Sequence, residues 1–270
     1  MNRALLIGIN AYPGDAALRK CVSDAMAART FLLLRAGFKV PDVWLLTDAD
    51  ATTEAVNRAL DWLLHNLVEG DRWFLLWSGH GAVMTHEDGA TEECLCPVDF
   101  DWSAMRAILA TSLRERFARI PGGVAGTAVL DSCYSGGMLS PRRKAPAGSP
   151  VLGYRKAKTY PLDASLNRGN ILPDLAMKTV AQPHAAVISG CRADQVSEET
   201  SAGGVCTNAL LAALAGADGL QVSHRTLVNR MQFYADCNGF NQVPQLLGYE
   251  ELLNRPLADL SAGMSIREDA

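Results

Sequence analysis

Two stretches of the sequence, TAVLDSCYSGG at residues 127–137 and WFLLWSGHGA at residues 73–82, decide the fold class. Each begins with a short apolar run that is typical of a buried strand, and each run passes directly into small and polar residues. A third run, ALLIGI at residues 4–9, ends in the same way. In open α/β sheets, sites form beyond the carboxyl ends of the strands. We therefore expect the polar residues that follow these runs to form a site.

Helical periodicity separates the strand-like runs. Apolar residues recur at helical spacing from Asp15 to Ala36, and Gly37 stands where a C-terminal cap is expected. A second amphipathic helix is predicted to begin at Thr52 and to stop at Gly70. Further strands are predicted at residues 43–46 and 185–188. Strands that alternate with helices predict an α/β fold, a three-layer sandwich with a mostly parallel central sheet and helices on both faces.

Composition excludes several classes of partner. The 270 residues are 49% hydrophobic, which suffices for a buried core, and the net charge is only −4 without a long block of one sign. We therefore expect neither nucleic acid nor a membrane as a partner. The first apolar run is too short for a secretory signal or a membrane span, so a cytoplasmic location is expected. The seven cysteines lack paired spacing, as expected of thiols in a reducing compartment.

Cys133 and His80 are the candidate catalytic pair. A thiol becomes a strong nucleophile once it is deprotonated, and an imidazole at a neighbouring strand end can take its proton. Gly79 and Gly81 flank the histidine, and Gly136 and Gly137 follow the cysteine, so the backbone amides of Gly81 and Cys133 can approach a bound carbonyl and stabilise an oxyanion, by roughly 3 kcal/mol per donor. Taken singly, each residue has a plainer interpretation, a buried hydrophobic cysteine and a structural histidine.

The two motifs resemble those of a known family. SGHGA and DSCYSGG resemble the histidine and cysteine motifs of metacaspases, the caspase-like peptidases of bacteria, plants, fungi and protozoa. Five more segments resemble the family in the right order: LIGINAY (6–12), CVSDA (21–25), CPVDF (96–100), ISGCRADQVSEE (188–199) and QVPQL (242–246). The resemblance implies one caspase-like domain, of a bacterial, type I-like form without a prodomain. Its expected parts are a large-subunit-like region (1–140), a connecting loop (141–178) and a small-subunit-like region (179–270).

The resemblance also implies an activity. Metacaspases cleave protein or peptide substrates after Arg or Lys, through a Cys-His dyad and an acyl-enzyme thioester, and they generally act as monomers. Carried over to this chain, the substrate pocket for the Arg or Lys side chain, S1, comprises Asp24, Ser78 and Asp131, with Cys21 close by. Two carboxylates would pair with a cationic side chain and disfavour an anionic one. Without the resemblance, both aspartates are more simply a solvated helix residue and a strand-end cap.

No cofactor is expected. Many metacaspases require calcium, bound by aspartates in two acidic segments. In this chain the first segment is reduced to two pairs, Glu87-Asp88 and Glu92-Glu93, and Ala110-Thr111-Ser112 stands in place of the second. Calcium prefers 6–8 oxygen ligands with several carboxylates, so we expect no tight calcium site and no calcium requirement.

Three alternative interpretations are weaker. Cys94 and Cys96 with His80 and His86 would form a zinc site, but their spacing is unusual and the site would use the catalytic histidine. The loop after the first strand could be interpreted as a nucleotide-binding turn, but it contains neither a G-x-G-x-x-G nor a Walker pattern. A caspase-like scaffold without peptidase activity is the remaining rival, and an assay with a basic peptide would separate it from an enzyme.

The segment from residue 140 to residue 170 reads as an exposed connection that is rich in glycine, proline and basic residues. Its basic side chains are the kind that the expected S1 pocket accepts, and proteolysis needs a segment able to extend into the site. The candidates for self-cleavage are Arg143, Lys144 and Arg155, followed by Lys156 and Lys158. The alternative is a solvated basic loop that is never cut.

Overall fold

A six-stranded sheet forms the centre of the molecule in the computed structural model, which describes residues 1–85, 91–133, 155–158, 185–192, 195–216, 219–248 and 250–257. Its strand order is β12-β9-β7-β3-β1-β2. The strands are β1 Asn2–Gly8, β2 Val43–Thr47, β3 Arg72–Ser78, β7 Ala125–Asp131, β9 Ala186–Ser189 and β12 Gln245–Leu247. Every neighbouring pair is parallel except β12 and β9. The predicted mostly parallel sheet is confirmed.

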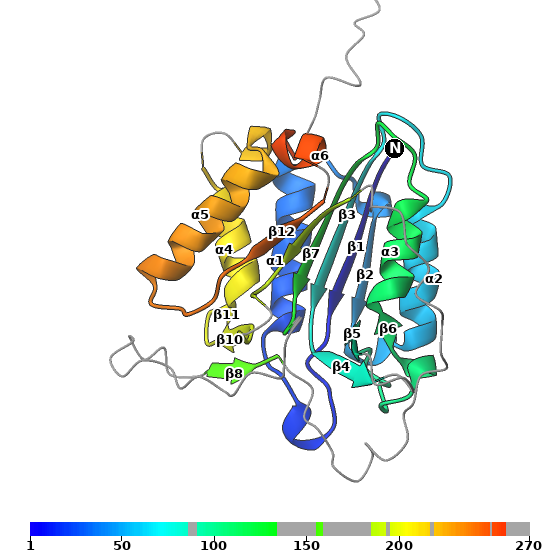
Figure 1. The fold of residues 1–270 in the computed structure, drawn as a ribbon, viewed down its shortest axis with the longest axis vertical. Coiled ribbons are helices and arrows are strands. Elements are labelled where there is room, and N and C mark those ends of the chain that lie inside the picture. Colours follow the sequence, from blue (N-terminus) through cyan, green and yellow to red (C-terminus); the bar gives the residue numbers. More distant parts are fainter. Residues whose placement is uncertain are drawn as a thin grey trace, which may run out of the picture.

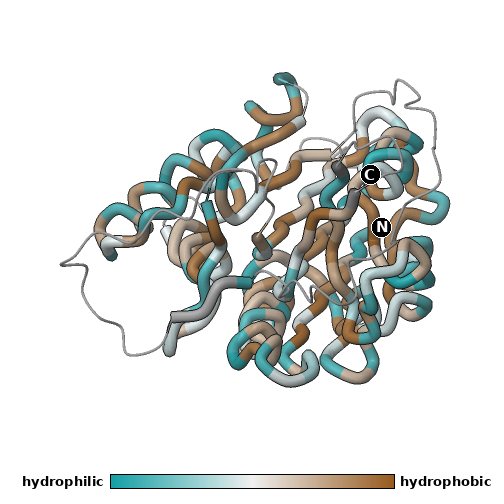
Figure 2. Tube along the Cα trace, turned by 60° about the horizontal axis from the view of Figure 1, so that its bottom comes forward, coloured by the Kyte–Doolittle hydropathy of each residue, from teal (hydrophilic) through white to brown (hydrophobic). Residues whose placement is uncertain are grey.

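Helices cover both faces of this sheet, as Figure 1 shows. The helices are α1 Cys21–Arg35, α2 Thr53–Leu64, α3 Ala110–Ala118, α4 Val205–Leu214, α5 His224–Cys237 and α6 Glu250–Asn254. One hydrophobic cluster joins the sheet to α2 and α3, and a second joins it to α1, α4 and α5. In Figure 2 hydrophobic residues concentrate along the central strands. The strands carry continuous apolar runs because both of their faces are buried.

Two small sheets lie beyond the carboxyl ends of the parallel strands (Figure 1). One contains β4 Gly81–Thr85, β5 Thr91–Leu95 and β6 Ile108–Leu109, in the order β4-β5-β6. The other contains β8 Arg155–Ala157, β10 Glu198–Thr200 and β11 Gly203–Gly204, in the order β11-β10-β8. Together they frame the edge of the sheet at which the sequence predicts a site.

The first predicted helix begins later than expected. The periodicity predicts a start at Asp15, but Gly14–Ala16 forms only a 3₁₀ turn and α1 begins at Cys21. The reason is tertiary: the Asn10 side-chain oxygen accepts a hydrogen bond from Cys21 N at 2.8 Å and so caps the helix from the end of β1. Gly37 has a φ of 72°, as its predicted role at the helix end requires.

The second predicted helix is also shorter than expected, since α2 ends at Leu64 and not near Gly70. Its predicted start is confirmed, because the Thr52 side chain accepts a hydrogen bond from Ala55 N. None of the helices in the described parts of the chain has the length and apolarity that a bilayer crossing requires.

Candidate active site

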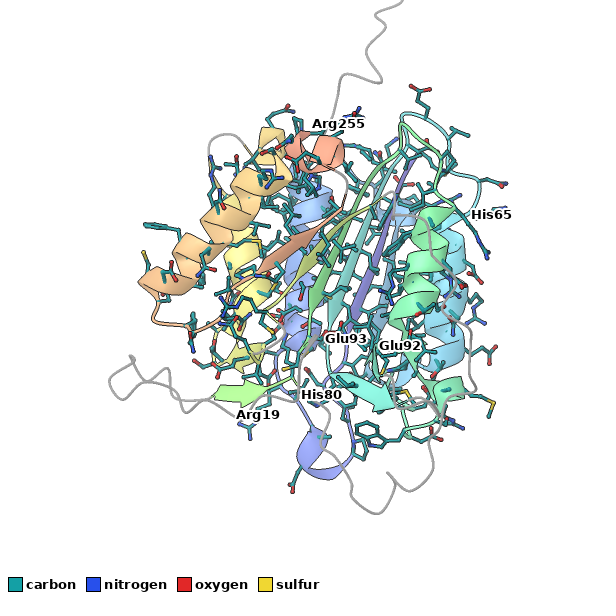
Figure 3. All side chains as sticks on the ribbon, in the orientation of Figure 1. Arg19, His65, His80, Glu92, Glu93 and Arg255 are labelled. Atoms are coloured by element: carbon teal, nitrogen blue, oxygen red, sulfur yellow. The ribbon has the colours of Figure 1, made fainter. Side chains whose placement is uncertain are left out.

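The site lies where two neighbouring parallel strands end. Ser78 and Asp131 are the last residues of β3 and β7, and they face each other in the strand register. His80 and Cys133 each lie two residues further along the chain, so the register brings the two loops side by side. Figure 3 shows His80 just beyond the carboxyl ends of the strands, between β8 and β4.

His80 is held on several sides. Its Nε2 lies 2.6 Å from the carbonyl oxygen of Ala16, and its backbone N donates to the Tyr12 hydroxyl at 3.0 Å. The Tyr12 ring also packs against the imidazole, with 4.5 Å between centroids. Because a carbonyl oxygen only accepts hydrogen bonds, Nε2 carries a proton, and Nδ1 is the nitrogen that can exchange one. The 3₁₀ turn that replaces the start of the predicted helix therefore supplies the oxygen that orients the imidazole.

Cys133 is buried, and its sulfur lies against the backbone of Ser197. The Ser197 N–H donates to Cys133 Sγ at 3.1 Å, and the Cys133 S–H donates to Ser197 O at 3.4 Å. An amide that donates to sulfur favours the thiolate over the thiol. Ser197 immediately precedes β10, so the second small sheet fixes the position of this sulfur.

The four residues expected to form S1 lie together. Asp24, Ser78, Asp131 and Cys21 are all buried, and Ser78 Oγ donates to Asp24 Oδ2 at 2.8 Å. We call Asp24, Ser78 and Asp131 the carboxylate pocket. Burial raises the pKa of Asp24, and nearby Lys158 partly offsets this effect. Burial also raises the pKa of Cys21 to about 12, so Cys21 is a neutral thiol in the pocket wall.

Donors from residues 197–207 hold the two carboxylates. Asp131 Oδ2 accepts from Thr207 N at 2.9 Å and from Thr207 Oγ1 at 2.6 Å, and Asp131 Oδ1 accepts from Ser197 Oγ at 2.9 Å. Asp24 accepts from Gly204 N at 3.0 and 3.1 Å. Gly204 and Thr207 lie in the first turn of α4, where the helix dipole favours negative charge. The sequence pointed to Ser197 only through the segment 188–199, and nothing in it pointed to Gly204 or Thr207.

The chain fills the pocket with its own Lys158. The Lys158 ammonium lies 2.9 Å from Ser78 Oγ, 3.0 Å from Asp131 Oδ1 and 3.4 Å from Asp24 Oδ2. The Lys158 side chain is fully buried. Burial disfavours its charge, but the attraction of Asp131 and Asp24 outweighs burial and raises the pKa of Lys158 well above its ordinary value. Lys158 is therefore an ammonium ion.

The backbone of Lys158 is bound as well. Its carbonyl oxygen accepts from Gly81 N at 3.1 Å and from Cys133 N at 3.4 Å, and its N donates to Ser197 O at 2.9 Å. The residues before it, β8, pair antiparallel with β10, with Arg155 opposite Thr200. Lys158 thus lies with its side chain between two carboxylates and its carbonyl group beside Cys133. Of the other candidates for self-cleavage, Arg143 and Lys144 lie outside the described residues.

The expected calcium and zinc residues have other contacts. Glu92 accepts a hydrogen bond from Thr111 N at 2.7 Å, and burial raises the pKa of Glu93 to about 6. Both glutamates belong to β5, and Figure 3 labels them. Cys94 and Cys96 are buried thiols, whereas His86, Glu87 and Asp88 lie outside the described residues. Among the residues that are described, no three His, Cys, Asp or Glu side chains are grouped to hold a metal.

Comparison with known proteins identifies the family. The family profile described as "Metacaspase, peptidase C14 domain" matches residues 2–141. The chain belongs to the metacaspase family. It is 30% identical over 268 residues to Metacaspase-2 of Trypanosoma brucei brucei, covering 90% of this chain and 72% of that protein. It is also 30% identical to Metacaspase-1 of Yarrowia lipolytica, covering 77% of this chain but only 52% of that protein.

Solved structures show the same fold. A crystal structure of a protein from Geobacter sulfurreducens matches with a TM-score of 0.69 and 21% identity, over 94% of this chain and 97% of that one. Caspase-1 from Spodoptera frugiperda matches with a TM-score of 0.58 and 14% identity, over 92% and 86% of the two chains. The predicted caspase-like fold and the metacaspase resemblance are thus confirmed, and the family is one of cysteine peptidases.

Proposed function

We propose that this metacaspase is a cysteine endopeptidase that cleaves after Lys or Arg, with Cys133 as nucleophile and His80 as acid and base. The observation that carries this proposal is the position of Lys158. Its ammonium contacts three oxygens of the carboxylate pocket, and its carbonyl oxygen accepts from two backbone amides beside the thiol. A substrate lysine bound for cleavage needs the same two sets of contacts. An arginine side chain would meet the same carboxylates.

The contacts support a two-step mechanism. The Cys133 thiolate attacks the carbonyl carbon of the residue before the cut bond, the P1 residue, and the oxyanion takes up the amide hydrogen bonds of Gly81 and Cys133. The C–N bond then breaks, and His80 donates a proton to the leaving amine. Water attacks the resulting thioester while His80 accepts its proton. This step restores the thiolate and releases the new carboxylic acid, which loses its proton to water.

The orientation of His80 suits both roles. Ala16 O holds Nε2–H in place, so Nδ1 gains and loses the proton during the cycle. The carbonyl contact also favours the imidazolium that forms when His80 takes the proton of the Cys133 thiol. Removing the imidazole should therefore lower both the rate of attack and the rate of amine release.

Lys158 is the proposed self-cleavage site. Arg155 lies three residues earlier in β8, where its backbone pairs with Thr200, whereas the Lys158 carbonyl group lies at the two amides. Cleavage would break the Lys158–Thr159 bond and divide the chain into 158- and 112-residue pieces. Until Lys158 leaves the pocket, it excludes other substrates, so self-cleavage and release would precede activity on other proteins.

The experiment compares the wild-type chain with Cys133→Ala. We expect the wild type to cleave a peptide with P1 Lys and to release a fragment that begins at Thr159, identified by N-terminal sequencing. Cys133→Ala should do neither while keeping the wild-type unfolding transition. Turnover of the peptide by folded Cys133→Ala would refute the assignment of the nucleophile. A new N-terminus elsewhere would refute only the choice of Lys158.

We further propose that the protein acts as a cytoplasmic monomer on protein substrates, without calcium. The calcium-independent part of this proposal is supported by Glu92 and Glu93, the two acidic side chains that the structure describes near the expected calcium segments. Glu92 already accepts the Thr111 amide, and a raised pKa makes Glu93 a weaker cation ligand. Sedimentation of the purified Cys133→Ala chain would test the monomer, since a stable dimer would contradict it.

A further inference from the structure

Gly204 lies against the end of the Lys158 side chain. A Cβ atom at this position would be 2.5 Å from Lys158 Nζ and 2.7 Å from Asp24 Oδ2, and it would also overlap Asp131 Oδ2. All three approaches are closer than van der Waals contact allows. The missing side chain of Gly204 therefore leaves the space that the ammonium and the two carboxylates occupy, and Asp131 Oδ2 is the atom nearest to that position.

The backbone does not require glycine at this position. Gly204 has φ −64° and ψ 134°, which any L-residue adopts without strain. The preceding residue differs, since Gly203 has a φ of 135°, where a side chain would be strained. Glycine at 203 is thus explained by conformation, whereas glycine at 204 is explained by the space that the cation and its paired carboxylates need.

Gly204 also holds one wall of the pocket. Its N–H donates to both oxygens of Asp24, and it is the N-cap residue of α4. Because Asp24 is fixed to this amide, the distance between its carboxylate and the Gly204 Cα cannot grow without losing a hydrogen bond. A substituent on that Cα must therefore project into the space of the P1 cation.

We infer that Gly204 is a specificity-determining residue, which sets the depth of the P1 pocket and thereby selects long cationic side chains. The inference rests on the proposed function, because it takes Lys158 to lie where a substrate lysine lies. A methyl group at 204 should exclude the ammonium of lysine and the guanidinium of arginine. Ornithine is one methylene shorter, about one carbon–carbon bond or roughly 1.5 Å, so it should be affected less.

The test uses the Lys158→Gln chain as parent, so that the chain's own lysine does not compete. Gly204→Ala is compared with this parent on three peptides that differ only in P1: Lys, Arg and ornithine. We expect kcat/KM to fall by at least about 100-fold for Lys and Arg but less for ornithine, so that the ornithine-to-Lys ratio rises at least about tenfold. Gly122→Ala is the matched control, because a Cβ at Gly122 meets nothing within 4 Å.

Two further measurements separate specificity from damage. Alkylation of Cys133 by iodoacetamide does not use the pocket, so its rate should stay within threefold of the parent. An equal loss on all three peptides, or an unchanged ornithine-to-Lys ratio, overturns the inference. If Gly204→Ala does not fold, the Lys158→Gln parent is assayed alone on P1 side chains of decreasing length. Its kcat/KM must then fall stepwise from Lys to ornithine to 2,4-diaminobutyrate, and equal values would refute the idea that pocket depth selects long side chains. If the parent is inactive on all peptides because it cannot cut itself at residue 158, binding of the same peptides to Cys133→Ala/Lys158→Gln chains with and without Gly204→Ala decides the inference instead. The proposed function is tested separately, by the wild-type chain.

Discussion

Replacing Lys158 by glutamine should open the carboxylate pocket to external peptides. The substitution is best made in a Cys133→Ala chain, because this chain cannot cut itself and binding is then measured without turnover. In the parent, an external peptide with P1 Lys must displace Lys158 from contacts of 2.9, 3.0 and 3.4 Å with three oxygens. In Lys158→Gln the ammonium that makes these contacts is gone.

The size of the effect follows from the buried ion pairs. Removing one partner of a buried, hydrogen-bonded charge pair typically costs about 2–5 kcal/mol. At about 1.4 kcal/mol for each tenfold change, Lys158→Gln should weaken docking of the chain's own segment roughly 30-fold to several thousand-fold. The backbone pairing of β8 with β10 remains, so part of the competition persists.

The assay is the Kd of a labelled peptide with P1 Lys, measured by fluorescence anisotropy. We expect Lys158→Gln to bind at least about tenfold more tightly than its parent. Lys39→Gln is the control, since Lys39 is exposed and far along the chain from β8. Equal Kd values for Lys158→Gln and its parent would refute the idea that Lys158 occupies the substrate pocket in solution.

Two other predictions concern metal and pH. The rate of peptide cleavage in excess chelator should agree within about twofold with the rate in millimolar calcium, because Glu92 and Glu93 have other contacts. A strong calcium dependence would contradict this prediction and would indicate a site that includes residues outside the described ones. His224 is buried, and burial lowers its pKa to about 4 from an ordinary value of 6.5, so the unfolded chain binds its proton more tightly. The contribution of neutral His224 to the free energy of unfolding is therefore fully present above pH 6.5 and is lost as the pH drops toward 4. Between pH 7.5 and pH 5, this group should lower the free energy of unfolding of Cys133→Ala by about 2 kcal/mol. In His224→Gln that loss should shrink by the same amount, and an unchanged pH profile would contradict the assignment.

The strands and the adjacent positions of His80 and Cys133 could be predicted because their signals are local. Each buried strand is a continuous apolar run, and His80 and Cys133 follow two of these runs at a fixed offset. The family resemblance then added Asp24, Ser78 and Asp131, which the structure brings together from α1, β3 and β7. Without it, the plainer interpretation of the two aspartates would have stood, since nothing in their immediate neighbours indicates burial.

The remaining parts of the site depend on tertiary pairing. Gly204 and Thr207 reach the carboxylates because α4 points its first turn at the end of β7, and no local pattern encodes that direction. Lys158 is one of several basic residues in its segment. The antiparallel register of β8 against β10 is what selects it, by bringing its carbonyl group to the amide of Cys133. The late start of α1 has the same kind of cause, a cap supplied by Asn10.

The carboxylate pocket should also make substrate binding depend on pH. Burial raises the pKa of Asp24, and a bound cation lowers it, so the empty pocket holds a proton on Asp24 to a higher pH than the filled pocket does. Binding of a P1 cation therefore releases a proton. The affinity of Cys133→Ala/Lys158→Gln for a P1-Lys peptide should rise with pH above about 4, the ordinary value for aspartate, until Asp24 is ionised in the empty pocket.

The same peptide affinity measured from pH 4.5 to pH 8 tests this coupling. Asp24→Asn removes the titrating group, so it should bind the peptide more weakly at pH 8 and with a flatter pH profile, while keeping the amide contacts of Gly81 and Cys133. A neutral peptide with P1 Gln controls for pH effects elsewhere in the site. If the P1-Lys and P1-Gln peptides follow the same pH profile, Asp24 does not exchange its proton for the substrate cation, and its protonation state is the same in the empty and the filled pocket.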